Sequence, residues 1–380
     1  MKSLGLYIHI PFCERKCRYC DFISFAGRER DIGPYVNALL MEMRTWKERL
    51  RGYQIDTIFI GGGTPTFLHE RDIEQILLEC FRLFHIAEQA EISLEANPGT
   101  LSLRKLEVYK RAGVNRLSLG LQAVESWHLA RLGRIHSFED FLVSYRLAHE
   151  KGFDNINIDL MFGLPDQTLE EWTETLDRVT ELEPAHLSCY GLIIEEGTPF
   201  YEEYRNGKLR LPREDDEREM YWKAVEELTK QGFEHYEISN FARSGYQCRH
   251  NLNYWENGEY IGLGCAAHSF FHAERIANET DLCSYINKIR ERGNAVVTRQ
   301  KIDRTDEMFE TVMLGLRLTK GLDLEAFQRR FHISFLEYYR EELEKLQRMN
   351  LIQIKDRYIS LTSMGMDVQN QVLVSFLKED

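Results

Sequence analysis

The chain contains no apolar run long enough to cross a membrane, no Lys/Arg-rich stripe and no low-complexity linker. A transmembrane helix needs about 20 mostly apolar residues in a row, and no stretch approaches that length. Acidic residues outnumber basic residues by 61 to 48, which disfavours proteins that bind nucleic-acid phosphates through a basic surface. The remaining composition, 43% hydrophobic and 29% charged over 380 residues, is typical of a globular protein with two or three domains.

The N-terminus begins like a lipoprotein signal but has no suitable cleavage site. An apolar run from Leu4 to Phe12 precedes Cys13, yet His9 and Pro11 interrupt it, and bulky Phe12 stands where a small residue is needed. We therefore expect a cytoplasmic protein. In that compartment we expect the eight cysteines to be metal ligands or buried thiols rather than disulfides.

Short apolar runs alternate with amphipathic helical patterns along the first two thirds of the chain. This alternation predicts βαβ units around a parallel sheet, and six or seven units fit a partial (β/α) barrel better than an open doubly wound sheet. The predicted strands are 5–10, 56–60, 91–95, 116–120, 155–161, 186–193 and 233–238. The predicted helices between them are 35–50, 71–84, 103–112, 138–151, 169–182 and 215–231.

The pattern changes near Gly293, so we expect one domain over 1–292 and a second, mainly helical domain over 293–380. The second domain resembles a winged-helix module. Because the chain is acidic, we expect that module to pack or to dock a partner rather than to bind DNA. Its predicted helices are 306–318, 324–331 and 334–349, followed by strands 351–354 and 358–361 and a last helix from Thr362.

Each unusual group of residues in the first domain follows a predicted strand. The C-terminal ends of the strands of a parallel barrel form one rim, and active sites are built there. The sequence therefore predicts a single site on that rim. The groups, in chain order, are three cysteines, Gly61-Gly62-Gly63, Asn97-Pro98, Gln122 and Gly163-Leu164-Pro165.

The three cysteines form the most specific motif, Cys13-x-x-x-Cys17-x-x-Cys20. Three thiolates in so short a loop can share one metal centre. A structural zinc site needs four ligands, and an iron–sulfur cubane held by only three cysteines keeps one iron open for another ligand. The spacing favours the open cluster. The alternative is a zinc clip, in which the three cysteines and a distant fourth ligand such as Cys248 or His250 hold one zinc ion.

The motif Cys-x-x-x-Cys-x-aromatic-Cys, here with Tyr19, resembles that of the radical S-adenosylmethionine (SAM) enzymes. The resemblance implies a [4Fe-4S] cluster whose open iron binds SAM. It also implies that further residues hold SAM. These are Tyr7, Tyr19, the glycines Gly62 and Gly63, Thr64, Glu95, Gln122, Arg134 and Asp159.

Chemistry supports two of these residues directly. The guanidinium of Arg134 offers two parallel donors to a carboxylate, and the carboxylate of Asp159 is an acceptor that suits the ribose diol. A charge inside the apolar strand around Asp159 is costly unless it is paired or bound to a ligand. The alternatives are a surface position for Arg134, a structural ion pair for Asp159, and ordinary strand packing or a polar strand end for Tyr7, Glu95 and Gln122.

Within the superfamily, the sequence most resembles the oxygen-independent coproporphyrinogen III oxidase group, which also contains HemW-like heme chaperones. Three features favour the chaperones. Phe22 stands where the oxidase has a further cysteine, Cys13 comes too early for the oxidase's N-terminal extension, and His250-Asn-Leu-Asn-Tyr254-Trp255 matches the chaperones' His-Asn-x-x-Tyr-Trp motif. Histidine ligates heme iron and aromatic rings stack on a flat macrocycle, although His250 could equally bond backbone in a buried turn.

The resemblance thus implies a heme chaperone that carries a [4Fe-4S] cluster, SAM and heme as cargo. Its expected partners are acceptor apo-hemoproteins, respiratory ones among them, with membrane contact only through such acceptors and none with nucleic acid. The first alternative is the enzyme that oxidatively decarboxylates coproporphyrinogen III. The second is a zinc-clipped regulator that uses its C-terminal wing on DNA. The sequence leaves the oligomeric state open.

Overall fold

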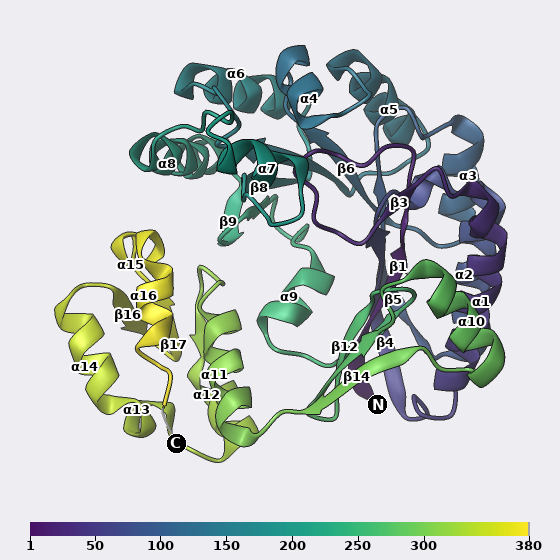
Figure 1. Cartoon of the computed structure of the whole chain (residues 1–380). Helices are drawn as coiled ribbons and strands as arrows, with labels where there is room; N and C mark the ends of the chain where they lie inside the picture. Colours follow the sequence, from purple (N-terminus) through teal and green to yellow (C-terminus); the bar gives the residue numbers. More distant parts are fainter. Residues whose placement is uncertain (379–380) are drawn as a thin grey trace.

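The computed structural model describes residues 1–378, and its main element is a 12-stranded sheet (Figure 1). The strands are β1 (Lys2–Ile10), β4 (Tyr53–Gly62), β5 (Ile86–Ala96), β6 (Arg116–Gln122), β7 (Ile156–Phe162), β8 (His186–Gly191), β9 (Glu234–Glu237), β10 (Asn240–Ala242), β11 (Tyr260–Leu263), β12 (His268–Phe271), β13 (Glu274–Asn278) and β14 (Val296–Lys301). Their order is β14-β13-β12-β11-β1-β4-β5-β6-β7-β8-β10-β9. Because β14 and β9 end this order without pairing, the sheet is a partial barrel, as expected.

The parallel part of the sheet confirms the predicted alternation. Strands β1, β4, β5, β6, β7 and β8 pair in parallel in chain order. The predicted strand 233–238 forms β9, but it lies on an antiparallel edge beside β10 rather than extending the parallel series. At the opposite edge β11 pairs in parallel with β1, and β12, β13 and β14 follow antiparallel.

Most helices cover the outer, convex side of the sheet, whereas α9 (Arg249–Trp255) lies on the inner side (Figure 1). The longer helices bury an apolar stripe, as in α2, where Ile73, Ile76, Leu77 and Cys80 face the core at three- and four-residue spacing. Four helices, α4, α7, α9 and α10, were not predicted. The helices of this part are α1 (Ile32–Trp46), α2 (Glu70–Leu83), α3 (Leu103–Arg111), α4 (Ser126–Leu132), α5 (Phe138–Glu150), α6 (Leu169–Thr180), α7 (Pro199–Arg205), α8 (Glu214–Lys230), α9 (Arg249–Trp255) and α10 (Leu282–Arg292).

The C-terminal part has a hydrophobic core of its own, which begins at Met308. The predicted helix 334–349 is divided at Tyr339 (φ −110°), and a short strand, β15, was missed. Since β14 still belongs to the large sheet, the division at residue 293 stays a prediction. The elements are α11 (Arg304–Gly315), β15 (Leu322–Asp323), α12 (Leu324–Phe331), α13 (Phe335–Tyr338), α14 (Arg340–Arg348), β16 (Ile352–Lys355), β17 (Tyr358–Leu361), α15 (Ser363–Asp367) and α16 (Gln369–Val374).

Candidate functional site

The three cysteines of the motif lie on one loop after β1. Two short parallel strands, β2 (Phe12–Cys13) and β3 (Phe25–Ala26), pair and close the ends of this loop. Cys13 is buried, Cys17 and Cys20 are half-buried, and all three thiols are free. Burial raises the pKa of the Cys20 thiol to about 11, so binding a metal there must displace a proton.

The end of the glycine-rich strand packs against this loop. The Thr64 hydroxyl donates to the Cys13 sulfur at 3.7 Å, and the Asn97 amide donates to Thr64 at 2.8 Å. A methyl group on Gly63 would lie 2.9 Å from the Cys13 sulfur and 2.7 Å from the Phe12 carbonyl oxygen, so only glycine fits here. Gly62 adopts φ 116°, a conformation that side chains rarely take.

Arg134 connects the cysteine loop to the rim. Its guanidinium donates to the Cys17 sulfur at 3.5 Å, to the Asn97 side chain at 2.8 Å and to the carbonyl of Gly120 at 2.5 Å. A Cβ on Gly120 would meet the side chains of Arg134, Asn97 and Gln122 within 3.1 Å, so this glycine lets the three converge. Arg134 is therefore not a free surface residue, which was the alternative. Gln122 lies beside Arg134, and its backbone φ is 75°.

The thiols do not converge as a zinc clip would require. Within residues 1–378, no three His, Cys, Asp or Glu side chains are placed to hold one metal ion. The two residues proposed to complete a zinc site are engaged elsewhere, Cys248 with Glu91 and His250 with Thr57. A cubane differs because each cysteine binds a separate iron, so its sulfurs need no common point.

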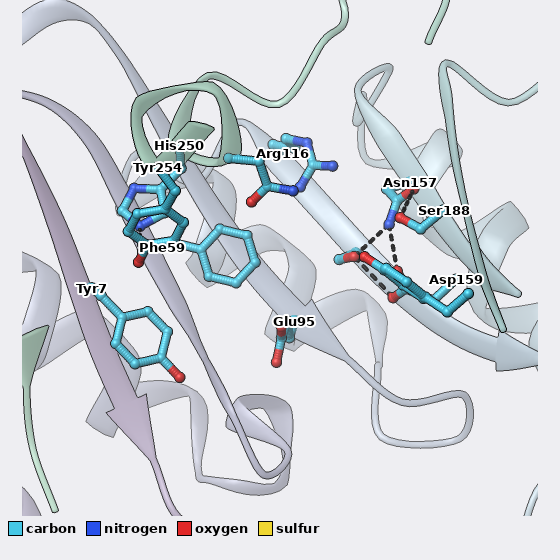
Figure 2. Close-up of a pocket in the computed structure, with 12 residues that line it drawn as sticks. Tyr7, Phe59, Glu95, Arg116, Asn157, Asp159, Ser188, His250 and Tyr254 are labelled. Atoms are coloured by element: carbon cyan, nitrogen blue, oxygen red, sulfur yellow. Dashed lines mark hydrogen bonds between the residues drawn. The ribbon is translucent and has the colours of Figure 1, made fainter. Parts of the chain in front are cut away.

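A cavity of about 200 Å³ opens inside the parallel strands (Figure 2). Tyr7, Glu95 and Asp159 from three of these strands line it, as do His250 and Tyr254 from α9. The structure thus brings predicted SAM residues and the predicted heme residue into one cavity. Its lining residues are Tyr7, Phe59, Glu95, Arg116, Ser118, Asn157, Asp159, Ser188, Tyr190, His250, Asn251 and Tyr254.

The two acids of the cavity are held by uncharged donors. Asp159 accepts from Ser118 at 3.0 Å and from Asn157 at 2.8 Å, and no salt bridge within 4.0 Å reaches it in the described part of the chain. Asp159 therefore has no direct ion-pair partner among residues 1–378, although the buried guanidinium of Arg116 opposes electrostatically the rise in its pKa that burial causes. Glu95 accepts from the backbone N–H of Gly62 at 3.0 Å. Burial, and then repulsion from Asp159, raise the pKa of Glu95 to about 7.

Tyr7 and Tyr19 occupy different surroundings. Tyr7 lies in the cavity wall, and its hydroxyl bonds Nδ1 of His9 at 2.9 Å. Tyr19 packs against a small hydrophobic cluster that includes Leu132 and Met161. Burial raises the pKa of both phenols, so both are neutral at physiological pH.

His250 is 1% exposed, and both ring nitrogens are already used. Nδ1 bonds the Thr57 hydroxyl at 2.7 Å and Nε2 bonds the Tyr254 hydroxyl at 2.8 Å. Burial lowers the pKa of His250 to about 3, so the imidazole is neutral. His250 could bind heme iron through Nε2 only if the hydrogen bond between Nε2 and the Tyr254 hydroxyl were broken.

The sequence reasoning missed Arg116, which lines the cavity from β6 and is 1% exposed. No salt bridge within 4.0 Å involves it among residues 1–378. It also missed Asn157, which lies two residues before Asp159 and therefore on the same face of β7. The signal that identified Asp159, a polar residue in an apolar strand, applies to both.

Comparison with known proteins agrees with this geometry. Residues 7–179 match the Radical SAM superfamily and residues 302–368 match the HemN C-terminal domain. Two relatives named heme chaperone HemW match over the whole chain, one from Bacillus subtilis (38% identical, 100% of both chains) and one from Escherichia coli (37% identical, 99% of its own length). The structure of coproporphyrinogen III oxidase (HemN) from E. coli has a TM-score of 0.86 at 26% identity, over 99% of this chain and 90% of that chain.

The chain therefore belongs to the radical SAM superfamily and, within it, to the family of the heme chaperone HemW. Membership of the superfamily implies SAM and a [4Fe-4S] cluster. No helix among residues 1–378 is both long enough and apolar enough to span a bilayer.

Proposed function

We propose that this protein is a cytoplasmic heme chaperone, which binds heme and delivers it to apo-hemoproteins, respiratory ones among them. The observation that carries the proposal is the match to relatives named heme chaperone HemW over the full length of both chains. Aromatic and histidine side chains at two neighbouring cavities support it, because such side chains suit a flat macrocycle that carries iron.

We propose that Cys13, Cys17 and Cys20 hold the [4Fe-4S] cluster. When bound, the cluster provides an open iron for SAM and an electron for its reduction. The contacts of Cys13 with Thr64 and of Cys17 with Arg134 support this assignment, since they place donors beside the thiols. Thiolates accept such hydrogen bonds, which favour the charged form of a ligand.

We propose that the rim above this loop holds SAM. Arg134 would pair with the carboxylate, Glu95 and the backbone at Gly62 and Gly63 would receive the amino group, and Asp159 would bind the ribose. The bonds of Asp159 with Ser118 and Asn157 would keep its carboxylate oriented toward the cavity. The remaining predicted contacts are Tyr7, Tyr19, Thr64 and Gln122.

Anaerobic reconstitution tests the cofactor assignment. We expect about four irons per chain, a brown absorbance, and an electron paramagnetic resonance signal that changes when SAM is added. Cys17→Ala should lose the cluster. Cys283→Ala is the matched control, because Cys283 is exposed and lies far along the chain from the motif. A wild-type protein that binds zinc and no iron would refute the assignment.

A transfer assay tests the chaperone function. Heme-loaded protein should convert an apo-hemoprotein to its holo form, and it should leave coproporphyrinogen III unchanged under anaerobic conditions with SAM and a reductant. The second candidate, the oxidase, is favoured by the TM-score of 0.86 to HemN. Decarboxylated product without heme transfer would establish that alternative.

A further inference from the structure

A second cavity, of about 360 Å³, lies beside the first and shares Tyr7 and Tyr254 with it. Its volume lies within the range of small-molecule sites. It is largely aromatic and apolar, and Asp21 is the one acid in its wall. The lining residues are Tyr7, His9, Asp21, Phe22, Ile23, Tyr254, Tyr260, Ala266 and His268.

Two apolar side chains at this cavity are unusually exposed. Phe22 is 63% exposed and Ile23 is 38% exposed, although both follow directly on the cysteine loop. His9 ties this segment to the barrel, because its Nε2 bonds the Ile23 carbonyl at 2.9 Å. Adjacent apolar side chains that a fold holds at the mouth of a cavity indicate a ligand with an apolar face.

Three histidines lie at the two cavities, and only one has free ring nitrogens. His9 bonds Tyr7 and the Ile23 carbonyl, and His250 bonds Thr57 and Tyr254. His268 is exposed, lines the second cavity, and its imidazole has no hydrogen-bond partner among residues 1–378. A neutral imidazole with a free nitrogen is a common ligand of heme iron.

The backbone that carries His268 pairs with β13 and packs closely against β11. A Cβ on Gly262 would lie 2.0 Å from the His268 carbonyl oxygen, so β11 and β12 can approach this closely only at a glycine. Gly264 has φ 106°, and its N–H donates to the buried carboxylate of Glu42 at 2.8 Å. Asn278 donates to the Gly264 carbonyl at 2.9 Å. These contacts fix the backbone beside the cavity and leave the imidazole of His268 available to a ligand.

We propose that His268 is the axial ligand of heme bound in the second cavity, with Phe22 and Ile23 against the macrocycle. This proposal rests on the proposed heme binding and names the site and the ligand. His250 is then a positioning residue, which fixes the Tyr254 hydroxyl and so the wall between the two cavities.

Titration of the full-length protein with ferric heme, followed by absorption and electron paramagnetic resonance, tests the proposal. The wild type should show a histidine-ligated spectrum. His268→Ala should lose that spectrum and bind at least about tenfold more weakly, since even partners of metal ligands contribute that much, and added imidazole should restore the spectrum. His250→Ala should weaken binding but keep the histidine-ligated spectrum.

His272→Ala is the matched control, because His272 is an exposed histidine in the turn of the same hairpin and lies outside both cavities. It should titrate like the wild type. A His268→Ala protein with the wild-type spectrum and affinity would overturn the assignment while leaving heme binding intact. A wild type that takes up no heme would overturn the proposed function as well.

Discussion

Gly63→Ala is the sharpest test of how the glycine-rich strand end supports the cysteine loop. The added methyl would lie 2.7 Å from the Phe12 carbonyl oxygen and 2.9 Å from the Cys13 sulfur. A carbon–oxygen contact needs roughly 3.3 Å, so the loop must move by about 0.6 Å. Overpacking of this kind lowers the free energy of unfolding by about 1–3 kcal/mol. The movement also displaces Cys13, which is a proposed cluster ligand.

We expect Gly63→Ala to lose most of its iron and sulfide after anaerobic reconstitution and to unfold at a lower denaturant concentration. The control is Gly33→Ala in the first turn of α1, where a Cβ has no neighbour within 4 Å apart from the adjacent residues, and this variant should keep its full cluster content. Full cluster content and unchanged stability in Gly63→Ala would refute the argument that this contact shapes the cluster loop.

Three further predictions concern charge and packing. Arg134→Met should weaken SAM binding by at least about tenfold in equilibrium dialysis, because a charged hydrogen-bond donor is lost; unchanged affinity would contradict its role. With the pKa of Glu95 raised to about 7, SAM affinity should increase as pH rises through 7 and the carboxylate forms, and Glu95→Gln should flatten this profile. The free energy of unfolding changes in the opposite direction. Because folding raises the pKa of Glu95, the contribution of this group to stability is greatest below a pH of about 4.5 and is lost as the pH rises through about 7. Phe335→Ala should cost about 3–5 kcal/mol in denaturant unfolding, because the ring is 1% exposed in the C-terminal core; an unchanged midpoint would place Phe335 outside that core.

The parallel half of the sheet was predictable because buried parallel strands are short apolar runs. The orientation of β9 was not recognised, although its cue is local. Only Ile238 and Ser239 separate β9 from β10, and so short a connection can join only antiparallel strands. The short strands after residue 259 carry little apolar periodicity, and β11 reaches its place beside β1 through contacts distant in sequence. No local pattern contains that information.

The cysteine motif and Asp159 were identifiable because their residue types are costly or rare in those positions. His268 was not, although it follows two glycines, Gly262 and Gly264, in the chain. Both histidines line a cavity, but only His268 has an imidazole without a hydrogen-bond partner among residues 1–378, and that property depends on the fold. Sequence reasoning therefore finds residues that are unusual in their strand or loop. It cannot decide which of several histidines has its nitrogens free.

Tyr7 and Tyr254 connect the proposed cofactor site with the proposed heme site, because each lines both cavities. Tyr7 is bonded to His9, which holds the segment with Phe22, and Tyr254 is bonded to His250. A molecule in either cavity therefore packs against side chains that form the wall of the other. If binding in one cavity changes the position of either tyrosine, affinity in the second must change by the same factor in both directions, because linkage is reciprocal. Heme affinity measured with and without SAM would thus report the coupling that these two rings carry, and replacing either ring with leucine should reduce it.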